Sequence, residues 1–194
     1  MKNKTTSTSP SQARRGFLRC IATMFGWLLV PFQSRAADSD SNSLGVGIIL
    51  KPDGGDDLLI GPRRAPVRIK IGKNNGSAKL AMGTEDIVPG DRIPVHKHGK
   101  EDELIFIHTG EGTATLGESR VSVKTGAVIF VPQGAWHGLE NTGTELLTMV
   151  WIFSPSGFEQ YFRDIGVKPN AAPLGLTDDE WHKVDAKYAI TYRR

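Results

Sequence analysis

Short apolar runs separated by turn-forming residues make up most of this chain of 194 residues. Clusters such as residues 53–55, 73–76 and 141–143 supply the Gly, Asn and Asp that turns favour. The expected strands are residues 44–50, 58–60, 67–71, 78–82, 103–108, 112–116, 120–123, 127–131 and 146–153. So many short strands in one stretch indicate an all-β fold, a small double-sheet jelly-roll barrel.

The last part of the chain changes to a helical period. Apolar residues recur at helical spacing within residues 157–165, which predicts a short helix. A second helix is expected after Thr177, because Thr177 and Glu180 have the spacing of a capping box. Its buried stripe would consist of Trp181, Val184 and Tyr188. We therefore expect a β-barrel domain over residues 38–166 and a helical tail over residues 167–194.

Residues 1–37 have the features of an export signal peptide. They include six basic residues, no acidic residue, and an apolar run at residues 20–32 that is short for a membrane span. Arg14 and Arg15, with the Gly-Phe-Leu that follows them, resemble a twin-arginine motif. An ordinary secretory signal and an uncleaved membrane anchor are the alternatives. Twin-arginine export predicts a periplasmic or otherwise exported protein, with no stable membrane anchor after processing.

Removal of this segment changes the charge of the protein. The full chain has 24 basic and 21 acidic residues, so loss of six basic residues leaves 18 against 21, a net charge of −3. A mature protein with this balance lacks a basic surface for phosphate groups, which argues against nucleic acid as a partner. The sole cysteine, Cys20, also lies in the segment. The mature protein would therefore contain no disulfide, no thiolate ligand and no cysteine nucleophile.

Four residues in the predicted barrel have the types and the spacing of a metal site. On a strand, His96 and His98 would point to the same face, because side chains two positions apart do so. Glu103 follows shortly after them, and His137 comes after a further apolar strand. Three imidazoles and one carboxylate suit a divalent transition metal. We therefore predict that all four bind a metal. The alternative is a set of polar core residues, whose buried groups would be left without partners at a cost in free energy.

Glycines and a proline around these residues extend the pattern into two motifs. They are Gly90, His96, His98, Glu103 and Gly110, then Gly126, Pro132, Gly134, His137 and Asn141. The sequence resembles the cupin superfamily at every one of these positions, and fifteen residues separate the motifs, as in compact single-domain members. The resemblance is to small bacterial cupins of the quercetin-dioxygenase-like type. It implies a cupin double-stranded β-helix with short C-terminal helices, a bound metal, and assembly as a homodimer.

Residues that share a strand face with the metal candidates are candidates for the pocket. They lie at even steps from Glu103 or from His137 and are Ile105, Ile107, Leu139 and Asn141. A mostly apolar lining suits a small organic ligand, and the same residues would equally suit an ordinary barrel core. His108 lies at an odd step from Glu103 and should face the opposite side of its strand.

A site of this composition leaves coordination positions for a substrate. One carboxylate and three neutral imidazoles give a divalent ion a net charge of about +1, which favours an anionic oxygen ligand. The resemblance implies a metal-dependent, dioxygenase-like enzyme that acts on a small oxygenated organic substrate, and the predicted signal peptide makes it an exported one. Glu103 is a candidate proton acceptor by partial dissociation. A non-redox decarboxylase, lyase or isomerase and a non-catalytic small-ligand-binding protein remain as alternatives.

Iron or manganese is the expected metal. Proteins exported by the twin-arginine route fold first, by resemblance to known cargo, so the metal would be loaded in the cytoplasm. In an open aqueous compartment the order of stabilities would favour copper and zinc instead. Nickel and cobalt also suit these ligands, so the residues themselves leave the choice of metal open.

Overall fold

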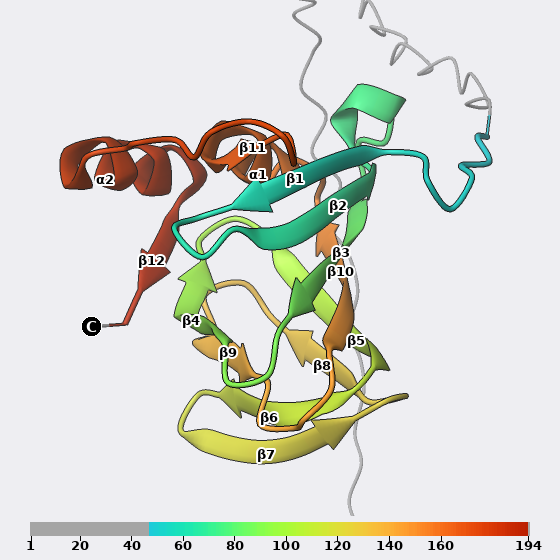
Figure 1. Cartoon of the computed structure of the whole chain (residues 1–194), viewed down its shortest axis with the longest axis vertical. Helices are drawn as coiled ribbons and strands as arrows, with labels where there is room; N and C mark the ends of the chain where they lie inside the picture. The colour runs from blue at the N-terminus through green and yellow to red at the C-terminus, as the bar shows by residue number, and fades with distance from the viewer. Residues whose placement is uncertain (1–46, 194) are drawn as a thin grey trace, which may run out of the picture. The chain divides into compact units, whose positions relative to one another are not determined.

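The computed structural model describes residues 47–193, so the predicted signal peptide, residues 1–37, lies outside the described residues. Within the described part, strands dominate and the helices are short (Figure 1). The strands are β1 (Asp56–Ile60), β2 (Ala65–Ile71), β3 (Ala81–Ile87), β4 (Arg92–His98), β5 (Asp102–Thr109), β6 (Glu111–Leu116), β7 (Ser119–Lys124), β8 (Val128–Val131), β9 (His137–Glu140), β10 (Leu147–Ser154), β11 (Gly166–Val167) and β12 (Ile190–Tyr192). The helices are the 3-10 turn η1 (Lys73–Asn75), α1 (Glu159–Ile165) and α2 (Asp178–Tyr188).

The strands form two antiparallel sheets. The larger sheet has the order β11-β1-β2-β3-β10-β5-β8, and the smaller has the order β12-β4-β9-β6-β7. Between β3 and β10 the chain passes repeatedly from one sheet to the other, so both layers are built from the same stretch of sequence (Figure 1). Such a double sheet with crossing connections is a jelly roll. The prediction of an all-β jelly-roll barrel is confirmed.

The centre of the core lies along β10. This strand pairs with β3 on one side and with β5 on the other. Trp151 on β10 has no exposed surface, and Phe153 has 2%. Trp151 lies opposite Gly83 of β3, where an added side chain would collide with the indole ring. The glycine therefore makes room for the largest side chain of the core.

Two expected strands differ from the observed ones. Residues 47–50, the described part of the expected strand 44–50, form no strand. The strand expected at residues 78–82 instead runs from Ala81 to Ile87 as β3. Its second half contains polar residues that alternate with buried ones, a pattern that apolar runs alone do not reveal.

The C-terminal part of the described chain contains both predicted helices. Helix α1 confirms the helix expected within residues 157–165. Helix α2 has the predicted capping box, in which Thr177 N–H donates to the Glu180 carboxylate and Glu180 N–H donates to Thr177 Oγ1. The expected buried stripe of α2 is only partly buried; it consists of Trp181, Val184 and Tyr188. Between residues 47 and 193, neither of these helices nor any other has the length and apolar character needed to cross a membrane.

The tail also supplies a strand that the sequence did not predict. Strand β12 pairs with β4, with Ile190 opposite His98 and Tyr192 opposite His96 (Figure 1). Helix α2 packs beside β12 and α1. The end of the described chain is therefore joined to the strand that carries two of the metal candidates.

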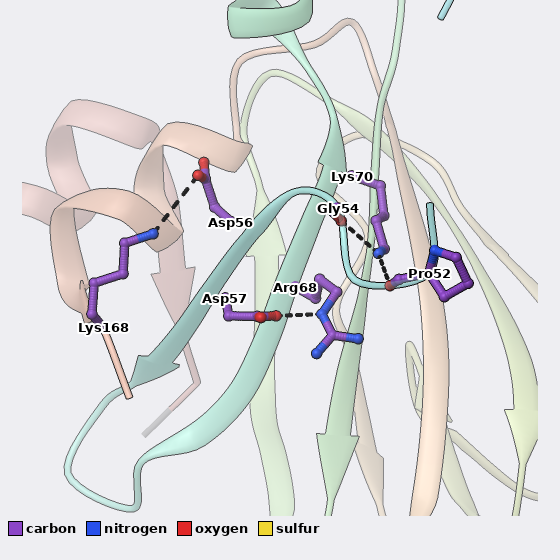
Figure 2. Close-up of polar contacts among 7 residues, drawn as sticks. All are labelled: Pro52, Gly54, Asp56, Asp57, Arg68, Lys70 and Lys168. Carbon is purple, nitrogen blue, oxygen red and sulfur yellow. Dashed lines mark hydrogen bonds and ion pairs between the residues drawn. The ribbon is translucent and has the colours of Figure 1, made fainter. Parts of the chain in front are cut away.

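Polar contacts connect the start of the described chain to strand β2 and join β2 to β1 (Figure 2). The Lys70 ammonium on β2 donates to the carbonyl oxygens of Pro52 and Gly54, at 2.6 Å each. Asp57 on β1 pairs with Arg68 on β2. These contacts hold the β1–β2 ribbon, and the turn at the end of that ribbon forms part of the wall of the cavity described below.

Candidate metal centre and its cavity

The four metal candidates come from three strands in two sheets. His96 and His98 lie on β4, His137 lies on the neighbouring strand β9, and Glu103 lies on β5 of the other sheet. His96 and His137 are a cross-strand pair, with ring centroids 4.1 Å apart. Each residue offers one ligand atom, and the four atoms all lie within 4.8 Å of one another. Strand alternation therefore brings all four side chains to one point between the sheets.

Several of these ligand atoms have no hydrogen-bond partner in the described structure. They are His98 Nε2, His137 Nε2 and Glu103 Oε2, and all three are buried. Glu103 Oε2 lies 2.8 Å from His137 Nε2 and 3.3 Å from His98 Nε2, but neither contact has the direction of a hydrogen bond. A buried polar atom without a partner costs about 1–3 kcal/mol. A cation between the three atoms would satisfy them together, so the residues fit a divalent metal.

Backbone carbonyls orient two of the imidazoles. The Nδ1 atoms of His96 and His137 each face the carbonyl oxygen two residues earlier, at 2.8 and 3.1 Å. Because a carbonyl only accepts, Nδ1 carries the hydrogen and Nε2 is left for the cluster. His98 has no such partner on Nδ1, and its ring packs edge-on against Phe158, with centroids 4.3 Å apart. Packing, in place of a hydrogen bond, therefore orients His98.

Electrostatics keeps two of the candidates in their metal-binding forms. Burial lowers the pKa of His96 to about 3, and the adjacent His137 and His98 act in the same direction. Burial by itself would raise the pKa of Glu103, but the imidazoles of His137 and His98 outweigh it, and the pKa is about 2. At neutral pH His96 is therefore neutral and Glu103 is ionised, as metal ligands must be.

The cluster forms part of the wall of a cavity of about 540 Å³, a volume typical of small-molecule sites. Of the four pocket candidates, Ile105 and Leu139 line this cavity, whereas Ile107 and Asn141 are not among the lining residues. Ile105 and Leu139 lie two positions along the strand from a metal candidate. Ile107 and Asn141 lie four positions away, about 13 Å along a strand, and so beyond the cavity. Ile107 is fully buried in the core, and Asn141 Nδ2 donates to the carbonyl oxygens of Ile87 and Glu145. His108 is exposed, as expected.

Sequence reasoning missed the other wall of the cavity. Its polar members come from the β1–β2 turn, from β3 and from the tail, and include Arg63, Glu85, Asp185 and Tyr192. These residues lie outside the two motifs, and the residues of β3 show no apolar alternation that would have marked Glu85 in the sequence. Burial first, and then the charge of Glu103, raises the pKa of Glu85 to about 8. Glu85 is therefore an uncharged carboxyl group at neutral pH.

Comparison with known proteins agrees with this architecture. Residues 83–153 match the family model of the cupin domain. A predicted oxalate decarboxylase from Thermotoga maritima is similar, with a TM-score of 0.51 and 23% identity over 56% of this chain and 99% of that one. The barrel has the cupin fold. KdgF from a Halomonas species is also similar, with a TM-score of 0.53 and 16% identity over 59% of this chain and 99% of that one.

Curated relatives of this cupin barrel include a dioxygenase and a binding protein. Gentisate 1,2 dioxygenase 1 from Aquipseudomonas alcaligenes is 29% identical over 147 residues, which are 66% of this chain and 42% of that protein. An oxalate-binding protein from Thermotoga maritima is 40% identical over 55 residues, 28% of this chain and 46% of that protein. The chain thus spans less than half the length of these two relatives, so the similarity concerns a part of each.

Proposed function

We propose that this protein is an exported, metal-dependent cupin enzyme that oxidises a small oxygenated organic substrate by dioxygenase-like chemistry. The observation that carries the proposal is the group of buried ligand atoms without hydrogen-bond partners in the wall of a substrate-sized cavity. The similarity to a gentisate dioxygenase supports the class of reaction. The narrower likeness to quercetin-dioxygenase-like cupins belongs to the same proposal and rests on the motifs alone.

Each part of the site has a role in this proposal. The residues that would hold iron or manganese are His96, His98, Glu103 and His137. When bound, such a metal supplies a Lewis acid that orients an oxygenated substrate and, being redox-active, permits chemistry with dioxygen. Ile105 and Leu139 provide apolar walls that exclude water from the reacting groups. In this proposal Glu103, by partial dissociation, would also accept a proton from a substrate hydroxyl group.

Elemental analysis and oxygen uptake on the same preparation test the proposal. The protein is recovered from the export compartment and supplied with dihydroxybenzoates, catechols and flavonols. We expect near-stoichiometric iron or manganese, and consumption of one dioxygen molecule per substrate molecule. A His98→Ala variant should lose both properties, whereas a variant of the exposed His108 should keep both.

Other outcomes would select a different function. Turnover without oxygen uptake would indicate a non-redox decarboxylase, lyase or isomerase. A small ligand retained through purification without turnover would indicate a binding protein. Wild-type protein without bound metal would refute the proposal. Full activity in Glu103→Gln with unchanged metal content would remove the proton-accepting role from Glu103.

Export and assembly complete the proposal. Arg14 and Arg15 support export by the twin-arginine route, and the cupin fold supports a homodimer. Cell fractionation and sedimentation of the mature protein measure these two properties directly. A protein that remains in the cytoplasm, or that sediments as a monomer, would contradict the corresponding part.

A further inference from the structure

The outer face of the larger sheet is apolar across four neighbouring strands. On β5, β10 and β3 every second side chain points into the core, and the side chains between them point outward. The strand register sets these outward residues, together with two on β8, in two rows that cross β8, β5, β10 and β3 in that order (Figure 1). One row consists of Phe130, Leu104, Ile152 and Met82, and the other of Val128, Phe106, Val150 and Thr84. All except Thr84 are apolar, and we call these apolar residues the outer patch.

The outer patch is unusual for a sheet face that meets water. When one face of an antiparallel sheet packs on the core, the other face commonly carries polar side chains. Here Val128 is 60% exposed and Phe130 is 57% exposed. The other members are partly exposed, because neighbours on a sheet face shield one another. The described residues 47–193 therefore leave a continuous apolar surface in contact with water, and such surfaces mark interaction sites.

Polar residues border the outer patch on three sides. Beyond β3, the next strand β2 carries Arg68, which forms the ion pair seen in Figure 2. At one end of the central strands Asp102 and Ser154 are a cross-strand pair. At the other end the Thr148 hydroxyl donates to the Asp86 carboxylate at 2.7 Å. An apolar centre with a polar border is the usual anatomy of a protein–protein interface.

The size of the outer patch suits the centre of a dimer interface. Strands lie about 4.8 Å apart and side chains on one face repeat about every 6.8 Å, so two rows on four strands cover about 260 Å² of flat sheet. Side chains that stand up from the sheet expose more than this flat area. A stable dimer buries about 800 Å² per partner, divided between an apolar centre and a polar rim. The outer patch is large enough for the centre, and its border would supply the rim.

Exposed apolar residues before β1 extend this surface beyond Met82. Leu50 lines a small pocket together with Met82 and Ile71. Ile49, the residue before it, is 98% exposed. An isoleucine in water beside an apolar patch favours cover by a second surface, because burial of its side chain is favourable. The area that needs cover is therefore larger than the two rows of the sheet.

We propose that this protein forms a two-fold dimer in which the outer patch of one copy packs on the outer patch of the other. A two-fold axis sets the same surface on both sides of an interface, so a patch without charged side chains is complementary to itself. The two sheets would pack about 10 Å apart with their strands about 30° from parallel. The inference rests on the homodimer of the proposed function and names the surface that forms it. Because Leu104 points outward from β5 and Glu103 points inward, the cavity of each copy would stay open to substrate.

Sedimentation of the mature protein over a dilution series tests this surface. The wild type should sediment as a dimer. Val128→Lys and Phe130→Lys should each raise the Kd of the dimer at least about tenfold, because the interface would bury a lysine without a partner. Val121→Lys is the matched control, since Val121 is 58% exposed but lies on β7 of the smaller sheet. This control should keep the wild-type Kd.

A variant at the far side of the outer patch separates the effect of the interface from a local disturbance of β8. Met82→Lys, on β3, should also raise the Kd at least about tenfold. Every lysine is introduced where the side chain of the single copy already meets water, so the fold should persist. Thermal unfolding and metal content, measured in each variant, should match those of the wild type.

Failure of the surface and failure of the proposed function give different results. If the wild type is a dimer and the variants of Val128, Phe130 and Met82 keep its Kd, the outer patch is refuted and the homodimer uses another interface. Equal weakening by Val121→Lys would also refute the outer patch. A monomeric wild type would refute both the homodimer and its surface, and would assign the outer patch to a different partner. Metal content and oxygen uptake decide the enzymatic part of the proposal independently.

Discussion

Replacing Glu85 by Gln should stabilise the protein at high pH and leave its stability at low pH almost unchanged. Burial, with the charge of Glu103, raises the pKa of Glu85 from 4.5 to about 8. The folded protein therefore keeps a proton that the unfolded chain releases between these two values. At about 1.4 kcal/mol per pKa unit, the wild type loses up to about 5 kcal/mol of unfolding free energy as pH rises through this window. Gln does not titrate and loses none.

Urea unfolding of the metal-free wild type and Glu85→Gln, at pH 4.5 and pH 9, measures this effect. The variant should gain several kcal/mol over the wild type at pH 9 and less than about 1 kcal/mol at pH 4.5. Glu145→Gln, which alters an exposed acid, is the matched control and should show no such difference. Bound metal adds positive charge to the cavity, so it should shrink the gain at pH 9. An equal effect of Glu85→Gln at both pH values would refute the reasoning.

The remaining predictions concern the metal, the core and export. His98→Ala should reduce bound metal at least about tenfold by elemental analysis, and unchanged metal would exclude His98 as a ligand. Trp151→Ala should lower the unfolding free energy by about 3–5 kcal/mol in urea, because the fully buried indole leaves a cavity; a loss below about 1 kcal/mol would contradict its place in the core. Lys at both Arg14 and Arg15 should stop export in a fractionation assay, whereas continued export would favour an ordinary secretory signal or a membrane anchor.

Local sequence contained most of the information about the barrel and its metal candidates. A side-chain period of two is enough to place His96 and His98 on one face of β4, because nothing distant is needed to set it. The capping box at Thr177 is local in the same sense, and it appears in the structure as expected. The sequence did not predict the second half of β3, because glutamate is seldom buried and Glu85 was therefore not expected in the core.

By itself, the sequence determined the strand-rich fold, the α2 capping box and the four candidate ligands. The capping box, His96 and His98 depend on residue types at short, regular spacings, whereas His137 was found from the second motif. Only the tertiary structure decided how the cavity is closed. Strand β12 adds to the edge of β4, and this pairing brings Tyr192 beside His96. No periodicity in the chain specifies such a pairing, because it depends on which edge of the folded sheet is free and on where α2 packs. The ligands are thus predictable from the two motifs, whereas the wall that faces a substrate results from long-range packing.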